Sequence, residues 1–477
     1  MPGWETVFQK VDDYRWLIPR SFKPEMRTDG LLYADEAMLP LLYKENAHVQ
    51  VANVACLPGI VGYSLAMPDI HLGYGFAIGG VAAFDPEQGG VISPGGVGYD
   101  INCGVRVLRT NLHKDEVRKK INDIANELAR EVPSGVGSTG VISLSEKEMD
   151  KVLTEGAKWA VKNGYGVNDD IEHTEANGAL AGADPSAVSH HARERGKDQV
   201  GTLGSGNHFL EVQFVEEIYD EAAANAFGLQ KDQVTIMVHT GSRGFGHQVC
   251  SDYINILHKA VAKYNIYLPD RQLVCAPVNS PEGKQYFSAM CAAANFAWCN
   301  RQLIMHWTRE SFAKAMGATP QQLGISLIYD VCHNIAKMEK HKVKGVGGSE
   351  IEKLLCVHRK GATRAFPGDP VLVPGDMGRY SYIMVGTELA MNETWGSVCH
   401  GAGRRLSRSA ALRKYNYKEL MADLDKQGIV VRSASRKGLV EEAPEAYKDV
   451  REVVDVVHNS GLAKKVVRLR PMVVVKG

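Results

Sequence analysis

Short apolar runs that end at glycine or at a polar side chain recur along most of this sequence of 477 residues. Runs of this kind, rich in β-branched residues and followed by turn-forming residues, are typical of strands. They cover 79–84, 105–110, 234–238, 325–329, 371–385 (with a tight turn) and 471–475. Helical spacing of apolar residues is found at 114–131, 146–163, 281–316 and 402–427. This mixture predicts an α+β fold with a β-rich core and surrounding helices.

The chain shows no internal repeat and no low-complexity linker. Its length alone would allow about three domains, but no boundary is marked, so we expect one large domain over residues 1–477. Residues 164–200 are polar and rich in Gly, Asn, Asp and His, which predicts a loop. The segment 281–316, with Ser280 as N-cap, is predicted to be a buried helix, because its uncharged stretch is shorter than the roughly 20 residues of a membrane span.

Composition places the protein in a broad class. The formal net charge is zero, which by itself gives no support to a nucleic-acid partner. The nine cysteines are odd in number and form no CxxC pair, so we expect a reducing compartment and no disulfide framework. Residues 1–13 are mixed and charged and carry no secretory signal. We therefore expect a cytoplasmic protein without membrane association, or a nuclear one if the source is eukaryotic.

Five segments offer metal-ligand side chains beside glycine or at the end of an apolar run. They are Gly98–Gly104 with Asp100 and Cys103, Gly204–His208, Val238–Gly241 with His239, Tyr329–Asn334 with Asp330, Cys332 and His333, and Cys399–Gly403 with His400. Carboxylate, thiol and imidazole together suit a divalent transition metal, and these ligand types alone favour zinc. One thiolate can bridge two ions, and two ions about 3.5–4 Å apart could clamp a phosphoryl group. Each segment alone fits an ordinary polar strand end or a buried cysteine equally well.

Two glycine-rich loops are candidates for phosphate binding. Cys399–Arg404 precedes a predicted helix, whose free N–H groups could face an anion, and its His400 imidazole could attack a phosphate to form a phosphoramidate. His239–His247 carries Arg243, which could fork onto a phosphate. The alternatives are an ordinary glycine-rich helix start and a tight turn with a solvated arginine.

A local basic patch follows the first of these loops. It contains Arg404, Arg405, Arg408, Arg413, Lys414 and Lys418, with no acidic residue between them. Arg404 and Arg408 are four apart and should share a helix face. A polyanion partner is one interpretation, and a solvated helix face is the other. Lys476, behind the apolar run 471–475, is either frayed in solvent or anchored by a strand inside a site.

These motifs resemble those of the RtcB RNA ligase family, over about residue 15 to Gly477. The resemblance rests on Met67–His71, Asp100–Val105, Gly206–His208, His239–Gly244, His333–Asn334 and His400–Arg404. It implies one distinctive fold and two Mn²⁺ per chain. Asp100, Cys103 and His208 would hold one ion, and Cys103, His239 and His333 the other. His400 would accept guanylate from GTP in a pocket of Asn207, His208, Glu211, Gly401, Ala402, Gly403, Tyr447 and Lys476.

The resemblance also implies the reaction. A GTP- and Mn²⁺-dependent RNA ligase would join RNA 3′-phosphate or 2′,3′-cyclic phosphate ends to 5′-hydroxyl ends, through guanylylated His400 and an activated RNA 3′ end. Its partners would be tRNA halves or broken RNA ends, in tRNA splicing or RNA repair, with an archease-like activator. At residues 376 and 379 we would expect a small hydroxyl residue and a small residue, but Asp376 and Arg379 occur. These two could pair with each other or alter the nucleotide pocket.

Two other hypotheses use the same residues. A dinuclear metallophosphoesterase could act on RNA or nucleotides with the same metal ligands and no covalent histidine. A non-catalytic RNA-binding scaffold would use only the basic patch. Covalent labelling by GTP distinguishes the ligase from both.

Overall fold

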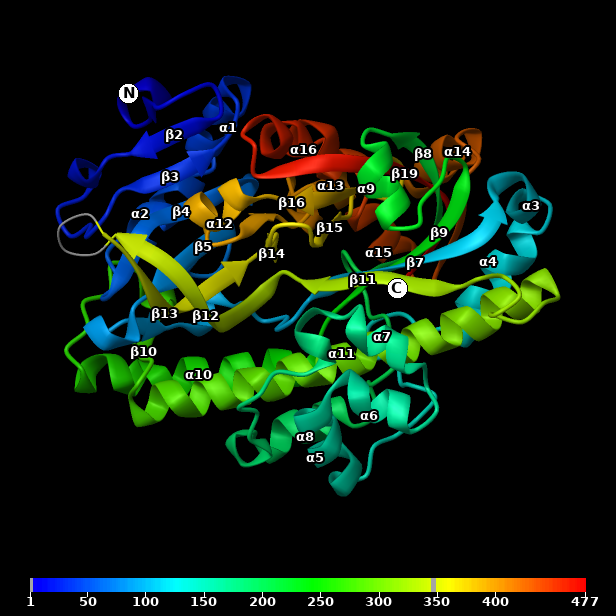
Figure 1. Ribbon diagram of the computed structural model, residues 1–477, viewed down its shortest axis with the longest axis horizontal. Helices are drawn as coiled ribbons and strands as arrows, with labels where there is room; N and C mark the ends of the chain where they lie inside the picture. Colours follow the sequence, from blue (N-terminus) through cyan, green and yellow to red (C-terminus); the bar gives the residue numbers. More distant parts are fainter. Residues whose placement is uncertain (1–2, 345–348) are drawn as a thin grey trace.

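Two large and mostly antiparallel β-sheets form the centre of the computed structural model, which describes residues 3–344 and 349–477 (Figure 1). The first sheet has the strand order β1 (Gln9–Lys10), β2 (Arg15–Ile18), β3 (Gly30–Tyr33), β4 (Ile60–His71), β5 (Ile78–Phe84), β13 (Glu350–Lys360), β12 (Asn334–Lys344). The second has the order β11 (Ser326–Cys332), β7 (Gly104–His113), β9 (Gln233–Thr240), β8 (Phe209–Ile218), β19 (Ala463–Lys476), β16 (Ser381–Gly386), β15 (Pro370–Val373), and β18 (Val430–Ser433) pairs with β19. Two short pairs join β6 (Val91–Ile92) to β10 (Ala276–Pro277) and β14 (Ala362–Arg364) to β17 (Ser397–Cys399).

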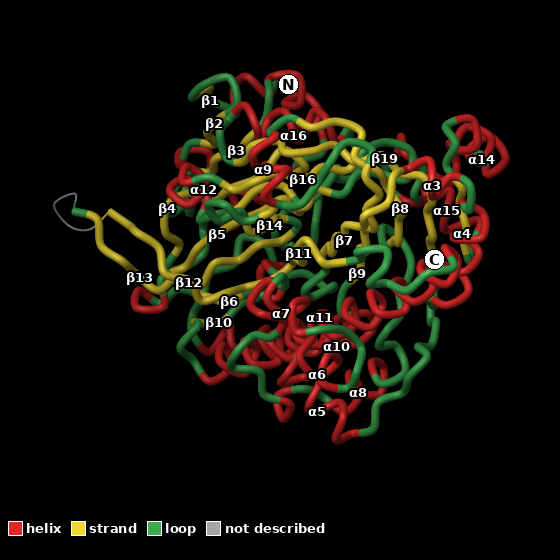
Figure 2. Tube along the Cα trace, turned by 45° about the vertical axis from the view of Figure 1, so that its right-hand side comes forward, coloured by secondary structure: helices red, strands yellow, loops and turns green. Residues whose placement is uncertain are grey.

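Helices surround these sheets, as predicted for an α+β fold. They are α1 (Leu39–Lys44), α2 (Ala47–Val54), α3 (Lys114–Arg118), α4 (Ile121–Glu131), α5 (Glu146–Glu155), α6 (Ala157–Lys162), α7 (Asn168–Glu172), α8 (His190–Gly196), α9 (Glu221–Ala226), α10 (Arg243–Lys263), α11 (Pro281–Met316), α12 (Glu388–Thr394), α13 (Arg408–Lys414), α14 (Tyr417–Lys426), α15 (Arg436–Glu441) and α16 (Val450–Asn459). In Figure 2, α5, α6, α8, α10 and α11 gather on one side of the strands.

The long helix α11 is the element that the sequence predicted best. It begins as expected, because the Ser280 hydroxyl accepts a hydrogen bond from the Gly283 N–H and Pro281 occupies the first turn. It ends at Gly317, whose φ of 73° is a conformation that glycine adopts without strain. Most of its length is buried, including the polar residues Asn295 and Arg301. No helix within the described ranges 3–344 and 349–477 has the length and apolar character of a membrane span.

Several predicted boundaries were wrong. The segment 146–163 forms two helices, because Gly156 has a φ of 58° and separates α5 from α6. The stretch 164–200 is not only loop, since it contains α7 and α8. The helical region predicted over 402–427 begins only at α13, with Ser407 as its N-cap. All nine cysteines are free and buried, in agreement with the absence of a disulfide framework.

Strand register brings distant polar residues to one end of the second sheet. Antiparallel pairing sets Val105 opposite His239, and Phe209 opposite His239 from the other side. Cys103 therefore lies just before β7 and His208 just before β8, both level with the end of β9. The pair of Cys332 with Gly104 brings His333, which follows β11, to the same end. Because neighbouring strands lie only about 4.8 Å apart, these side chains can meet.

Candidate active site

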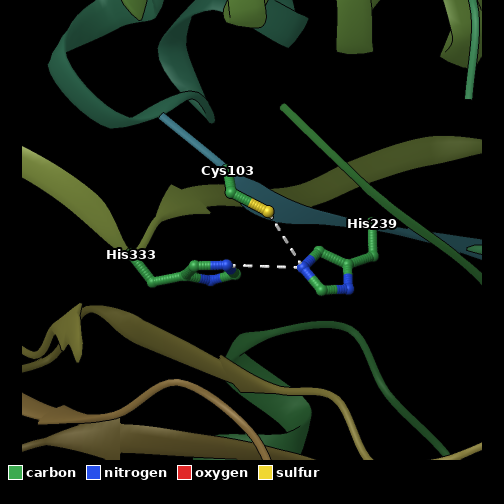
Figure 3. Close-up of side chains that lie close together, drawn as sticks. All are labelled: Cys103, His239 and His333. Carbon is green, nitrogen blue, oxygen red and sulfur yellow. Dashed lines mark hydrogen bonds between the residues drawn. The ribbon is translucent and has the colours of Figure 1, made fainter. Parts of the chain in front are cut away.

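Five side chains converge at that end of the second sheet, with Cys103 at their centre. The Cys103 Sγ lies 3.5 Å from His208 Nε2 and 3.3 Å from His239 Nε2. The His239 Nε2 lies 3.3 Å from His333 Nε2, so the thiol and the His333 ring both point at the same nitrogen (Figure 3). On the other side, His208 Nε2 is 2.8 Å from Asp100 Oδ2. The set forms two groups of potential metal ligands, and Cys103 belongs to both.

The protonation of these groups fits a divalent metal ion. Burial raises the pKa of the Cys103 thiol well above its ordinary value, and the charge of Asp100 adds to the effect. Burial also lowers the pKa values of His239 and His333 well below the usual range, with neighbouring imidazoles contributing. Both rings are therefore neutral, and their Nε2 atoms face each other at 3.3 Å. Neutral imidazoles beside a thiol and a carboxylate are the donor set of a transition-metal site, where the ion would also deprotonate the thiol.

Backbone groups hold the side chains of Asp100 and His208 in place. Burial raises the pKa of Asp100, but the adjacent His208 outweighs this effect and lowers it to about 2. The carboxylate is therefore ionised, and its Oδ1 also accepts the backbone N–H of Ser242. The His208 Nδ1 lies 3.0 Å from the Leu203 carbonyl oxygen, which places the ring proton on Nδ1 and leaves Nε2 free for a cation.

Asp330, which we considered as a potential ligand, belongs to neither group. Its carboxylate is fully buried and accepts hydrogen bonds from Arg106, Arg301 and the Trp298 indole. Arg301 in turn donates to the backbone oxygens of Asn102 and Thr240, which are next to Cys103 and His239 in sequence. Asp330 therefore anchors an arginine that ties together the two ligand-bearing loops, and His333 is the residue of the segment Tyr329–Asn334 that joins a ligand group.

His400 reaches the same place from a different part of the chain. It follows β17, and its ring centroid lies 4.9 Å from that of His333. The His400 Nδ1 is 2.5 Å from Asp69 Oδ2, and the same oxygen accepts the His400 backbone N–H at 2.9 Å. Burial raises the pKa of Asp69, but His400 outweighs it, so the carboxyl is ionised. Because Asp69 contacts Nδ1, the other ring nitrogen of His400, Nε2, is left to face the cavity.

The role of Asp69 was missed in the sequence. Residue 69 appears there only within the motif Met67–His71, and 331 positions separate it from His400. No periodicity links residues so far apart. Lys360 was missed for the same reason: it lines the cavity, its ammonium donates to the Phe76 carbonyl at 3.1 Å and to that of Tyr74, and burial lowers its pKa to about 7.

A cavity of about 400 Å³ connects the ligand groups with the predicted nucleotide residues. Its lining includes Asp100, Cys103, Asn207, His239, His333, His400, Gly401, Ala402, Gly403, Tyr447 and Lys476. Glu211 is not among the lining residues: its side chain is buried and accepts a hydrogen bond from Gln213 Nε2 at 2.8 Å. His208 does not line the cavity either, and it belongs to the metal-ligand group of Asp100 and Cys103.

The glycine loop after His400 has a different local structure from the one predicted. Residues 404–407 separate it from α13, so no helix N-terminus follows it directly. Gly403 has a φ of 73°, and a Cβ at this position would lie 2.4 Å from the Asp69 carbonyl oxygen. Glycine is required here by backbone conformation and by close packing against β4. The helix expected directly after this loop therefore begins later than predicted, at Arg408.

Arg404 is not on a helix face with Arg408. Its guanidinium donates to both oxygens of Glu442 at 3.0 Å and to the Tyr447 hydroxyl, and it lies over the Tyr447 ring at 5.0 Å. Arg408, at the start of α13, approaches the same Glu442 carboxylate at 3.7 Å. Both arginines line the cavity, but Glu442 and not a shared helix brings them together.

Lys476 is anchored, which is the second of the two alternatives for this residue. It ends β19 and pairs in register with Phe209, and only 4% of it is exposed. Its ammonium lies 3.4 Å from the His208 carbonyl oxygen and 5.7 Å from the Phe209 ring centroid. Burial lowers its pKa, against the opposing effect of Glu442 and Glu211. The end of β19 therefore positions the Lys476 side chain at the cavity wall.

Ligand groups that share a thiol, next to a histidine oriented by a carboxylate, suit a metal-dependent enzyme that acts on phosphoryl groups. The family model described as "tRNA-splicing ligase RtcB" matches residues 50–477. A "tRNA-splicing ligase RtcB" of Archaeoglobus fulgidus is 54% identical over 99% of both chains. That of Thermococcus kodakarensis is 54% identical over 98% of both, and that of Methanococcus maripaludis is 53% identical over 99% of this chain and 100% of its own. The chain belongs to the RtcB family of RNA ligases, which use metal and GTP.

Proposed function

We propose that this ligase joins RNA 3′-phosphate or 2′,3′-cyclic phosphate ends to 5′-hydroxyl ends, with His400 as the covalent carrier of guanylate. The observation that supports this most strongly is the contact between Asp69 and the His400 Nδ1 at 2.5 Å. It selects one ring tautomer and presents Nε2 as the nucleophile, in the cavity that Cys103, His239 and His333 also line.

The same proposal assigns the metal ligands. Asp100, Cys103 and His208 would hold one Mn²⁺, and Cys103, His239 and His333 would hold the second. When bound, the ions would polarise phosphoryl oxygens as Lewis acids. The choice of manganese rests on family membership, because thiol and imidazole ligands suit zinc equally well. The number of two ions is supported by the two ligand groups that share one thiol.

In the first chemical step, the lone pair on His400 Nε2 forms a bond to the α-phosphorus of GTP. The bond from that phosphorus to its bridging oxygen breaks, and pyrophosphate leaves with the electron pair. The His400 ring becomes positively charged, because Nδ1 keeps its proton. The ionised Asp69 carboxylate stabilises that charge and holds the ring in place.

The guanylate is then transferred from His400 to the 3′-phosphate of the RNA. A 2′,3′-cyclic phosphate is first hydrolysed to a 3′-phosphate, one of whose oxygens attacks the guanylate phosphorus. The P–N bond breaks and its electron pair returns to Nε2. The 5′-hydroxyl of the second RNA attacks the activated 3′-phosphate and loses its proton, and GMP leaves. Arg408 lines the cavity and suits the RNA phosphates by charge.

The substrate is proposed from the relatives, whose names state tRNA splicing. We propose tRNA halves as the RNA, with repair of other broken RNA ends as a further use of the same chemistry. We also propose an archease-like activator as partner and the cytoplasm as the location.

Incubation with α-labelled GTP and Mn²⁺ tests the proposal. Wild type should become covalently labelled, and His400→Ala should not. His258→Ala removes an exposed histidine from α10 and should be labelled like wild type. A wild type that stays unlabelled but cleaves phosphate esters would identify a metallophosphoesterase. An unlabelled and inactive protein that binds RNA would be a scaffold.

A further inference from the structure

The part of β4 that carries Asp69 runs without a neighbouring strand. The strand β3 pairs with β4 from Ser64 to Ala66, and β5 pairs with it up to Ala66 and again at His71. Residues 67–70 lie between these pairs and are buried, and no strand pair in the described part of the chain includes them. Buried backbone carbonyl groups that no strand pairs need another donor, because they have also lost their bonds to water.

Lys448 supplies the donors for two of these carbonyl groups. Its ammonium lies 2.5 Å from the Ile70 carbonyl oxygen and 3.3 Å from that of Pro68, on either side of Asp69 in the chain. The carbonyl oxygen of Asp69 itself accepts from His71 Nδ1 at 2.9 Å. A lysine ammonium is compact and has three donors, so it can serve two carbonyl oxygens where a neighbouring strand is missing.

The backbone of Lys448 is bonded to the loop that follows His400. Its N–H donates to the Gly403 carbonyl oxygen at 3.0 Å, and Gly403 packs so closely against Asp69 that it leaves no room for a Cβ. The Lys448 carbonyl oxygen accepts a hydrogen bond from Arg379 Nη1 at 3.3 Å. Lys448 therefore connects the two segments whose relative position sets the contact between Asp69 and His400.

Arg379 is one of the two residues at which the sequence departs from the family pattern. A small residue, as expected at this position, could not reach the Lys448 carbonyl oxygen. The Arg379 Nε also lies 3.6 Å from Asp376 Oδ2, so the two unexpected residues contact each other. Arg379 thus adds a link to the backbone of Lys448 that the family resemblance did not imply.

The Lys448 ammonium is an unusual cation for a protein interior. Only 7% of the residue is exposed, and within residues 3–344 and 349–477 its hydrogen-bond partners are carbonyl oxygens and not carboxylates. Burial lowers its pKa to about 8, whereas the negative charges of Asp69, Glu45 and Glu452 act in the opposite direction. A buried ammonium without a carboxylate partner costs stability, and groups of this kind concentrate at functional sites.

We propose that Lys448 is a positioning residue for His400 and acts through Asp69. By holding the backbone on both sides of Asp69, its ammonium aims the Asp69 carboxylate at His400 Nδ1. This inference rests on the proposed function, in which His400 carries guanylate. Lys448 is not one of the residues that line the cavity, so it acts on the orientation of the ring and not on a ligand. A displacement of about 1 Å in a reacting group can cost roughly 100-fold in rate.

A double-mutant cycle of Lys448→Met and Asp69→Asn tests this inference, with the rate of covalent GTP labelling at saturating GTP and Mn²⁺ as the measurement. Lys448→Met alone should slow labelling by about 10- to 100-fold, with little change in KM for GTP. The double variant should be no slower than Asp69→Asn, because Lys448 acts only through the carboxylate that this variant lacks. Lys448→Arg keeps charged donors and should retain more of the wild-type rate than Lys448→Met.

Lys120→Met is the matched control, because the Lys120 ammonium also donates to a backbone carbonyl, that of Met316 at 2.8 Å, but does not line the cavity. It should be labelled at the wild-type rate. Urea unfolding and metal content check that Lys448→Met is folded, and if it is not, the same cycle with Lys448→Arg decides. Wild-type labelling in the Lys448 variants, or losses that multiply in the double variant, would overturn the inference. Absence of label on wild type would instead overturn the proposed function.

Discussion

The metal-ligand end and the nucleotide end of the cavity are constructed in different ways. At the metal-ligand end, Cys103, His208, His239 and His333 each lie next to the end of a strand of one sheet, so backbone pairing sets their positions. The nucleotide end is formed by loops, and side-chain contacts such as that of Arg404 with Glu442 hold it together. Backbone register tolerates little change, whereas ion pairs between loops can be exchanged. The unexpected residues occur at the nucleotide end.

The two ends also differ in charge. At the metal-ligand end, burial keeps the imidazoles of His239 and His333 neutral, which suits cation binding. At the nucleotide end, burial raises the pKa of Glu211 to about 8 and that of Asp376 to about 7. The first end is therefore prepared for ions that bring positive charge, whereas the carboxyl groups of the second end keep their protons to a higher pH than usual.

Removal of the shared thiol should have the largest effect and tests whether the metal-ligand end acts as one unit. Cys103→Ala takes one donor from each ligand group, so we expect both ions to be lost and guanylylation and ligation to fall below detection. Metal content per chain, measured together with GTP labelling, checks this. Cys275→Ala, which removes another buried thiol, should keep both properties. Retained ligation in Cys103→Ala would contradict the role of Cys103 as the ligand that both metal-ligand groups share.

Asp69→Asn should have the next largest effect, because Asp69 connects the two ends through His400. The amide cannot stabilise a charged ring and can favour the other tautomer, so we expect guanylylation to slow by about 10²-fold or more. Metal content should stay as in wild type, which separates orientation of His400 from loss of the ligand groups. The pH dependence of labelling should also change. Asp85→Asn serves as control, and equal rates for Asp69→Asn and wild type would contradict the positioning role.

The smallest effect is expected for stability at the nucleotide end. The pKa of Glu211 is raised from an ordinary value of 4.5 to about 8, chiefly by burial. Between these values the folded protein holds a proton that the unfolded chain releases, so this group makes stability fall as pH rises from about 5 to 8. Glu211→Gln should remove that loss and stabilise metal-free protein at pH 8 by about 1–3 kcal/mol.

Urea unfolding of metal-free wild type and Glu211→Gln, at pH 5 and pH 8, measures this. The difference between the two proteins should grow with pH. If the free energies of unfolding of the two proteins differed equally at pH 5 and pH 8, Glu211 would be ionised in the folded state. The contrast in charge between the two ends of the cavity would then disappear.

The sequence by itself determined the types of element and the chemistry available. Local periodicity predicted the strands and α11, and the Ser280 cap followed from the residues next to it. The family resemblance of its motifs implied the ligand residues. Within a segment, these inferences depend on neighbours a few positions apart, and such interactions are the ones that spacing can reveal.

Only the tertiary structure decided how those residues are used. It paired Asp69 with His400, turned Asp330 toward arginines and left Asp376 Oδ2 without a hydrogen-bond donor among residues 3–344 and 349–477. These outcomes depend on burial and on contacts between residues hundreds of positions apart, such as Asp69 and His400. Desolvation and hydrogen bonding act through space, so a side chain's role is settled by which groups surround it after the sheets have assembled.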